Sequence, residues 1–116
     1  MKTAYRVVPD TNVIIAAKKH PSPASPNVEF VERWQHEEFA LLYSDDTLLE
    51  YIYKLRTQGV AEHSIKKLIR AILALGQTIH IHWYRYHLPK YPVDPDDIAF
   101  LLCADNGQAT HIICDV

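Results

Sequence analysis

The chain of 116 residues has little of what would mark a special class of protein. Its two cysteines, Cys103 and Cys114, stand among apolar neighbours without a paired-cysteine motif, which predicts reduced core thiols rather than a disulfide scaffold. No apolar run has the length of a membrane-spanning helix, and the run after Lys2 and Arg6 is too short for a signal peptide. We therefore expect a cytoplasmic protein with no membrane contact.

A strong charge of one sign, internal repeats and low-complexity segments are also missing. The net charge of −2 argues against a strongly basic nucleic-acid scaffold, but it is compatible with an enzyme that binds phosphate locally. With 48% apolar and 22% charged residues, the composition is that of an ordinary globular protein. The length predicts a single domain over residues 1–116.

Short apolar runs alternate with helical patterns along the chain. Strands are predicted over residues 5–9, 39–43, 78–83 and 111–114, and helices over residues 11–17, 27–36, 45–58, 61–75 and 94–104. Such alternation is typical of an α/β fold, in which a mainly parallel sheet lies between two helical layers as an α/β/α sandwich.

Polar residues and glycines predict where these helices begin and end. Asn27 and Ser44 are suitable N-caps, and Gly59 and Gly76 are suitable stops. Asn106–Gly107 predicts a turn before the last strand.

The third helix has a predicted apolar stripe, and Glu50 points away from it. The stripe consists of Leu48, Leu49, Ile52 and Leu55. Glu50 then either faces a solvent cleft, lies idle on the surface, or closes a capping box that starts at Thr47.

Four acidic residues are expected at one edge of the sheet. Asp10 and Asp115 follow the first and last strands, and right-handed crossovers bring both strand ends to the same edge. Asp97 and Glu50 approach this edge from the helices. Each could serve as a cap, a dipole partner or a turn residue, but crowded carboxylates repel one another unless they are protonated or bridged by cations. Oxygen ligands suit Mg²⁺ or Mn²⁺, which predicts hydrolysis of a phosphodiester.

Four segments of the chain carry a resemblance to a known family. They are residues 7–13, residues 43–51, the run Asp94–Leu101 and the run Ala109–Asp115. In this order the segments resemble a PIN domain, and in particular the toxin components of prokaryotic toxin–antitoxin systems.

The resemblance implies a metal-dependent ribonuclease with Asp10, Glu50 and Asp97 as the acidic core and Asp115 as the fourth acid. It also implies that Asn12, or Thr11, orients the first carboxylate, and Asp96 competes with Asp97 for its role. The implied partners are an RNA substrate, a protein antitoxin that blocks the acidic cleft, and further copies of the chain in a homodimer or higher oligomer.

The chain departs from the family pattern at its end. Family members continue past the fourth acid with a helix and a short strand, whereas this chain stops at Val116, so a shortened C-terminus is expected. Two other functions therefore stay open. One is a catalytically impaired domain that binds a partner. The other is a Mg²⁺-dependent phosphoacceptor domain, although that function calls for a pair of acids after the first strand and a lysine near the last.

Three further groups of residues have ordinary interpretations. His80 and His82 share a strand face, but without further ligands at suitable spacing we prefer a polar strand edge to a zinc site. Lys66, Lys67 and Arg70 form the solvated face of an amphipathic helix. The aromatic residues of the loop 84–93 and Trp83 before it are expected to pack against a partner.

Overall fold

The sheet is parallel and has four strands in the part of the chain that the computed structural model describes, which comprises residues 5–19, 22, 24–82, 88 and 97–113. The strands are β1 (Arg6–Pro9), β2 (Ala40–Tyr43), β3 (Gln77–Thr78) and β4 (His111–Ile113), in the order β3-β2-β1-β4. Strand β1 pairs with both β2 and β4, and β2 pairs with β3. The predicted α/β fold is therefore confirmed.

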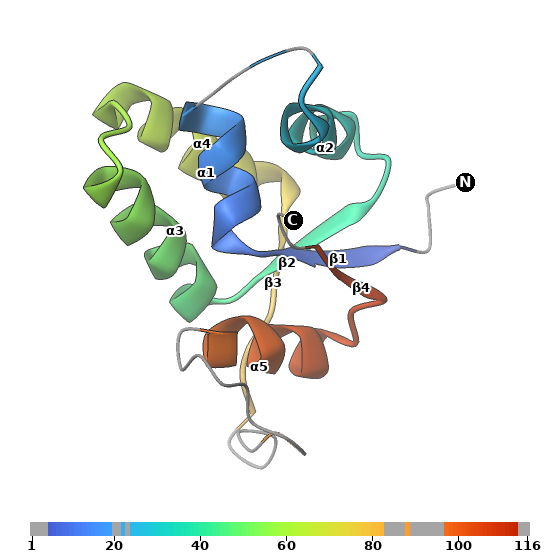
Figure 1. The fold of residues 1–116 in the computed structure, drawn as a ribbon. Coiled ribbons are helices and arrows are strands. Elements are labelled where there is room, and N and C mark those ends of the chain that lie inside the picture. The colour runs from blue at the N-terminus through green and yellow to red at the C-terminus, as the bar shows by residue number, and fades with distance from the viewer. Residues whose placement is uncertain (1–4, 20–21, 23, 83–87, 89–96, 114–116) are drawn as a thin grey trace.

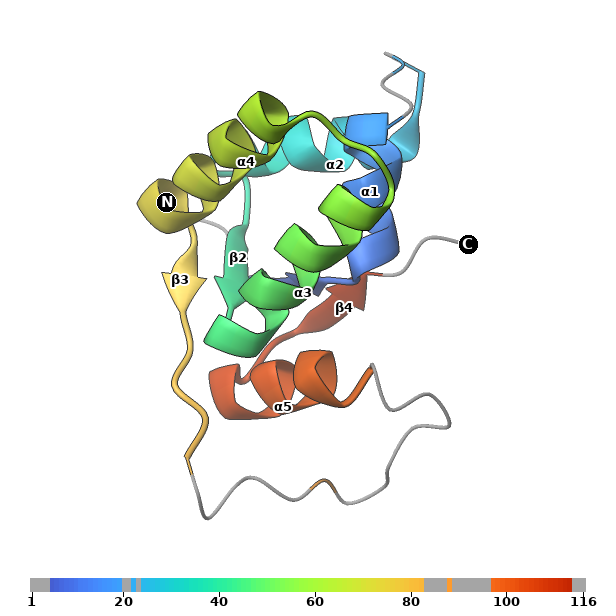
Figure 2. The ribbon, with the colours of Figure 1, turned by 90° about the vertical axis from the view of Figure 1, so that its left-hand side faces the viewer.

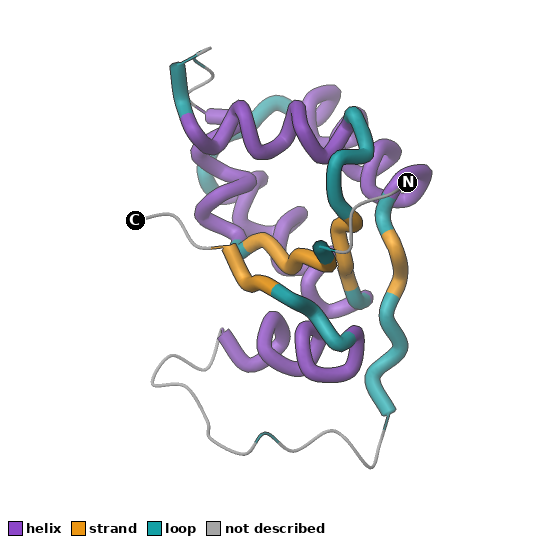
Figure 3. Tube along the Cα trace, turned by 90° about the vertical axis from the view of Figure 1, so that its right-hand side faces the viewer, coloured by secondary structure: helices purple, strands orange, loops and turns teal. Residues whose placement is uncertain are grey.

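Helices cover both faces of this sheet. They are α1 (Thr11–Lys19), α2 (Pro26–Gln35), α3 (Asp45–Thr57), α4 (Glu62–Leu75) and α5 (Ile98–Gly107). Helices α1 to α4 lie on one side of the strands and α5 lies on the other (Figures 1 and 2). Figure 3 shows the chain from another side, where the strands lie between α5 and the other helices. These are the three layers of the predicted sandwich.

The strand order places a reversal of direction beside β1. The chain moves outward from β1 to β2 and β3 and then crosses to β4, on the far side of β1. In open parallel sheets, ligands bind outside the carboxyl ends of the strands at such a reversal. Asp10 follows β1 directly, so it stands at the position where this topology favours a site.

The core lies mainly between the sheet and the four helices on one face. Val8, Leu41 and Leu42 of the strands are fully buried, and Trp34 and Ile72 pack into the same cluster from α2 and α4. Cys103 of α5 is also buried and free, as predicted, whereas Cys114 lies outside the described residues. None of the helices in the described part is long and apolar enough to cross a membrane.

The start of helix α2 differs from the prediction, whereas the start of α3 agrees with it. Helix α2 begins at Pro26, and its N-cap is Ser25, whose side chain accepts a hydrogen bond from the amide of Asn27. The prediction of Asn27 as the cap was wrong because proline is well suited to the first helical position, which moves the cap one residue earlier. Helix α3 does start after the predicted cap Ser44, and Gly59 follows it in the left-handed region with φ 81°.

The buried face of α3 also differs from the predicted stripe. Tyr51 and Leu55 are fully buried, whereas Leu49 is 62% exposed. On α4 the predicted pattern is correct for Ile65 and Leu68, but Leu73 is exposed. Tyr51 thus sets the rotation of α3 about its own axis. A search for aliphatic residues at helical spacing does not identify this position.

Strand β3 ends earlier than the predicted strand over residues 78–83. Strand β3 covers Gln77–Thr78. Beyond it, the amide of Ile79 still donates a hydrogen bond to the carbonyl of Tyr43, the last residue of β2, at 2.7 Å, and Trp83 is outside the described residues. Helix α5 continues through Asn106–Gly107, where a turn was predicted, and Gln108 in the left-handed region ends it with φ 52°. Strand β4 covers His111–Ile113, and Cys114, the last residue of the predicted strand, lies outside the described residues.

Candidate active site

Asp10 is held where β1 passes into α1. Its amide donates a hydrogen bond to the carbonyl of Ile113 in β4 at 2.7 Å, and its carbonyl accepts one from the amide of Val13 at 3.1 Å. Its Oδ1 accepts a hydrogen bond from the amide of Thr11 at 2.7 Å. The carboxylate is therefore oriented from its own backbone, at the positive end of α1.

Glu50 is not part of the capping box of α3. Thr47 Oγ1 accepts a hydrogen bond from the amide of Ser44 at 2.9 Å, and Ser44 Oγ accepts one from the amide of Thr47 at 3.3 Å. These two residues form the box themselves, so the alternative in which Glu50 closes a box with Thr47 is wrong. Glu50 is half-buried, and its carboxylate lies 4.0 Å from Lys54 Nζ.

Tyr51 determines which way Glu50 faces. Its side chain is fully buried, and its hydroxyl donates a hydrogen bond to the carbonyl of Pro9 at 2.5 Å. Burial raises the pKa of this phenol well above its ordinary value, so the hydroxyl remains a donor at neutral pH. The bond ties α3 to the residue before Asp10 and sets the helix rotation that turns Glu50 toward the start of α1.

Asp97 stands at the N-cap of α5 without acting as a side-chain cap. Its backbone has φ −77° and ψ −13°, and its carboxylate makes no cap hydrogen bond. One turn later Phe100 is buried, and its ring lies 5.7 Å from the ring of Tyr51. This contact between aromatic rings holds the start of α5 beside α3, so Asp97 approaches the two other acids from the opposite layer.

Asp10, Glu50 and Asp97 line one pocket of about 260 Å³. Its other walls are Thr11, Asn12, Ile15, Lys54, Gln58 and Phe100. A second cavity of about 150 Å³ adjoins it, lined by Asp10, Asp97, Phe100, Leu101 and Ile112. Three of the four predicted acids thus lie around one pocket although they come from three different elements. Asp115 and Asp96 lie outside the described residues.

Two small polar residues contribute to the same pocket. Asn12 is exposed there, whereas Thr11 is buried, with 6% of its surface exposed. The Thr11 hydroxyl has no hydrogen-bond partner among the described residues. A buried hydroxyl without a partner is costly, so Thr11 is held in this position by the rest of the fold.

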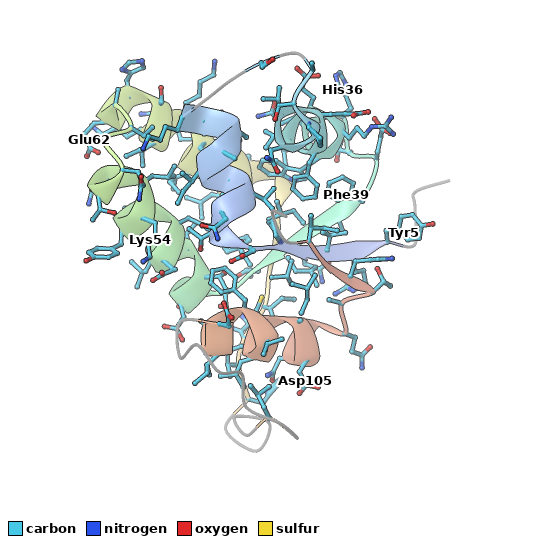
Figure 4. The ribbon with its side chains drawn as sticks, in the orientation of Figure 1. Tyr5, His36, Phe39, Lys54, Glu62 and Asp105 are labelled. Atoms are coloured by element: carbon cyan, nitrogen blue, oxygen red, sulfur yellow. The ribbon has the colours of Figure 1, made fainter. Side chains whose placement is uncertain are left out.

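Lys54 gives the pocket an internal cation. It lies one helical turn after Glu50 on α3, and Gln58 follows after another turn, so the three side chains share one face of the helix. Figure 4 shows Lys54 on α3 close to α1. The periodicity of α3 did not identify Lys54 or Gln58 as site residues. Their positions, four and eight residues after Glu50, nevertheless indicate that they share its helix face.

The oxygen-rich donor set suits a hard divalent cation, but the carboxylates are not gathered around one point. Within the described ranges, no three histidine, cysteine, aspartate or glutamate side chains are arranged to hold one metal ion. Glu50 is drawn to Lys54 instead, which is favourable when three carboxylates share a pocket. His80 and His82 are both exposed.

A comparison with known families identifies the family to which the chain belongs. A family model described as a PIN domain matches residues 6–115, which is nearly the whole chain. The chain belongs to the PIN domain family. PIN domains are generally nucleases and typically use divalent metal ions, and toxin–antitoxin systems are their usual context. No curated protein matches the sequence.

Proposed function

We propose that this PIN domain is a metal-dependent endoribonuclease that acts as the toxin component of a toxin–antitoxin system. The observation that carries the enzymatic part is the shared pocket of Asp10, Glu50 and Asp97, in which neither the Glu50 nor the Asp97 carboxylate makes a helix-cap hydrogen bond. Carboxylates from separate segments that face one pocket favour a cation-binding site over a set of surface acids.

In this proposal Asp10, Glu50 and Asp97 hold one or two Mg²⁺ or Mn²⁺ ions, with Asp115 as a fourth ligand. When bound, such an ion places positive charge against the phosphoryl oxygens and makes water a better nucleophile. The amide of Thr11 keeps Asp10 in its orientation, and the exposed Asn12 side chain offers hydrogen bonds to the ligands. Asp96 is the alternative to Asp97 as the acid from this segment.

Lys54 has a separate task in the same mechanism. In the present arrangement its ammonium group neutralises Glu50 across 4.0 Å. With a divalent ion held by Glu50, the Lys54 ammonium group beside it would be placed to attract a phosphate oxygen of the bound RNA. The pocket thereby contains groups for the ion and for the anionic substrate side by side.

A cleavage assay tests the enzymatic part. Purified protein is incubated with single-stranded and structured RNA in Mg²⁺ or Mn²⁺, and wild type is compared with Asp10→Asn, Glu50→Gln and Asp97→Asn. Each variant should cleave about a hundredfold more slowly or worse, because each removes a ligand carboxylate. The matched control is Asp105→Asn, an exposed acid of α5 outside the pocket, which should cleave as wild type. Equal cleavage by all five proteins would contradict the proposed site.

The same variants separate this proposal from a catalytically impaired binding domain. If the wild-type protein binds RNA but cleaves none of the substrates in either metal, the impaired domain is the better description. A phosphoacceptor domain would instead become labelled on an aspartate by a phosphoryl donor, with loss of the label in Asp10→Asn.

The toxin role and its partners are tested in cells and in solution. Induced expression of the wild type should arrest bacterial growth and expression of Asp10→Asn should not, and a small protein encoded beside the gene should restore growth by occupying the pocket. Self-association predicts a particle of at least twice the 13.4 kDa chain mass in light scattering. Growth arrest by Asp10→Asn as strong as by wild type would contradict a nuclease toxin.

A further inference from the structure

The carboxylates of Asp10 and Asp97 stand between two unlike cavities. The larger pocket, of about 260 Å³, has further polar side chains in its walls, among them Asn12, Lys54 and Gln58. The adjoining cavity of about 150 Å³ shares Asp10, Asp97 and Phe100 with it, and its remaining walls are Leu101 and Ile112. Apart from the two acids, the side chains of the described residues that line this second cavity are all apolar. The acidic pair therefore has a polar side and an apolar side.

The apolar wall is fixed in position relative to both acids. Leu101 follows Asp97 by four residues on α5, which is the spacing of neighbours on one helix face. Ile112 directly precedes Ile113, whose carbonyl accepts the hydrogen bond from the amide of Asp10 at 2.7 Å. Figure 2 shows the end of β4 on the same side of the molecule as the start of α5. The segments that position each acid thus also position one part of the apolar wall.

The apolar side chains leave surface open in this cavity. Ile112 is 38% exposed, although Val8, its partner in the register of β1 and β4, is fully buried. Leu101 is half-buried, and Phe100 is held by its ring contact with Tyr51. The place of β4 at the edge of the sheet accounts for the exposure of Ile112. Open apolar surface in a cavity beside two carboxylates is nevertheless typical of a site that receives the apolar part of a ligand.

A nucleotide has both of the parts that these two cavities fit. Its phosphate is anionic and is attracted by a cation at the acids, and its base has a flat face that packs against apolar side chains without hydrogen bonds. In a nucleic acid strand the two parts are joined by one sugar. A strand with a phosphodiester at the acidic pair therefore carries a base into reach of the apolar cavity.

We propose that the cavity between α5 and β4 receives the base of a nucleotide next to the scissile bond, in contact with Leu101 and Ile112. The inference rests on the proposed nuclease function and adds a base-binding subsite to it. The lining side chains of the described residues include no hydrogen-bond donor, so the subsite requires a base but does not read the acceptor groups on its edge.

The first test compares RNA with and without bases. Fluorescence anisotropy follows a labelled oligouridylate of about five nucleotides and an abasic oligomer with the same number of phosphates, both in Ca²⁺, which takes oxygen ligands. Electrophoresis confirms that both oligomers stay intact. The wild type should bind the oligouridylate about tenfold more tightly than the abasic oligomer, because only the former places a base in the cavity.

Two variants and a matched control locate this preference. Ile112→Thr keeps a β-branched residue in β4, and Leu101→Gln keeps a good helix former in α5. Each should reduce the preference for the oligouridylate from about tenfold to about threefold and leave the affinity for the abasic oligomer unchanged. Leu73→Gln replaces a 57% exposed leucine of α4, outside both cavities, and should keep the full preference.

The second test uses the wild-type protein and does not depend on the folding of a variant. Methyl groups of isoleucine and leucine are labelled with ¹³C and observed by NMR during titration with each oligomer. The aromatic base should shift the methyl signals of Ile112 and Leu101 by its ring current, and the abasic oligomer should not. The methyl signals of Leu73 should stay in place with both.

The inference is overturned if the wild type binds the two oligomers equally, if Ile112→Thr and Leu101→Gln both keep the preference of Leu73→Gln, or if the oligouridylate leaves the Ile112 and Leu101 methyl signals unchanged. Cleavage by wild type and Asp10→Asn in Mg²⁺ or Mn²⁺ is measured in parallel. Cleavage that depends on Asp10 without a preference for bases refutes the subsite alone. Base-dependent methyl shifts without such cleavage support the subsite and refute the nuclease function.

Discussion

The hydrogen bond between Tyr51 and Pro9 joins the two segments that carry Asp10 and Glu50. The Tyr51 hydroxyl is fully buried and lies 2.5 Å from the Pro9 carbonyl, and its ring packs at 5.7 Å from the ring of Phe100. Tyr51→Phe removes the hydroxyl and keeps the ring contact. The change therefore isolates the hydrogen bond with little loss of packing.

Loss of this bond leaves a buried carbonyl group without its donor, which costs about 1–3 kcal/mol. Unfolding a chain of 116 residues has an entropy of about 0.24 kcal/mol/K, so Tyr51→Phe should lower the Tm by about 4–12 °C. Thermal and urea unfolding followed by circular dichroism measure the effect. The urea m-value should not change, because the fold and its buried surface are retained.

The control makes the same chemical change two residues later. Tyr53 is 61% exposed on the same helix, and Tyr53→Phe should change the free energy of unfolding by less than about 0.5 kcal/mol. If Tyr51→Phe were as stable as Tyr53→Phe, the hydrogen bond to Pro9 would not fix α3 against β1, and the explanation given for the orientation of Glu50 would be refuted.

Three other changes test local features of the fold. Ser44→Ala removes a buried cap and should destabilise by about 1–2 kcal/mol in urea unfolding, more than Ser25→Ala at the half-buried cap of α2; equal losses would contradict the role of burial. Gln108→Gly should stabilise by about 0.5–1 kcal/mol because φ is 52°, and a lower Tm would show that no strain is stored there. Burial raises the pKa of the Cys103 thiol to about 11 from an ordinary value of 9.0. Stability from the neutral thiol is present below about pH 9 and is lost as the pH rises toward 11, so the wild type should lose about 2–3 kcal/mol more than Cys103→Ala over this range.

Local patterns in the sequence were sufficient for the general architecture. Apolar runs ending at polar residues predicted β1 and β2, Ser44 predicted the start of α3, and Gly59 and Gly76 predicted the ends of α3 and α4. The parallel sheet followed from the alternation of strands and helices. These features depend on residues close together in the chain, so they can be predicted without tertiary contacts.

The differences arise where a distant contact outweighs a local preference. Tyr51 replaces Leu49 on the buried face of α3 because the carbonyl of Pro9 satisfies its hydroxyl. Gly107 lies in α5 and not in a turn, and a Cβ there would stand 3.0 Å from side-chain atoms of Ile79 and Leu42, so the glycine serves close packing of the helix. A glycine that permits close packing cannot be told from a turn glycine by sequence alone.

The candidate site was predictable in its acids but not in its cations. The topology brings Asp10, Glu50 and Asp97 to one pocket, as expected for the carboxyl edge of a parallel sheet. Lys54 and Gln58 line the pocket because of the rotation of α3 about its axis. Helix rotation and helix packing are set by the whole core, so no local pattern encodes them.

The central claim is that Asp10, Glu50 and Asp97 act as one metal site, and calorimetric titration with Mn²⁺ tests it most directly. Wild type and Asp105→Asn should bind Mn²⁺ with the same affinity, and Asp10→Asn and Asp97→Asn should each bind at least about tenfold more weakly. Indistinguishable titration curves for wild type, Asp10→Asn and Asp97→Asn would show that these carboxylates share no ion and would contradict the account.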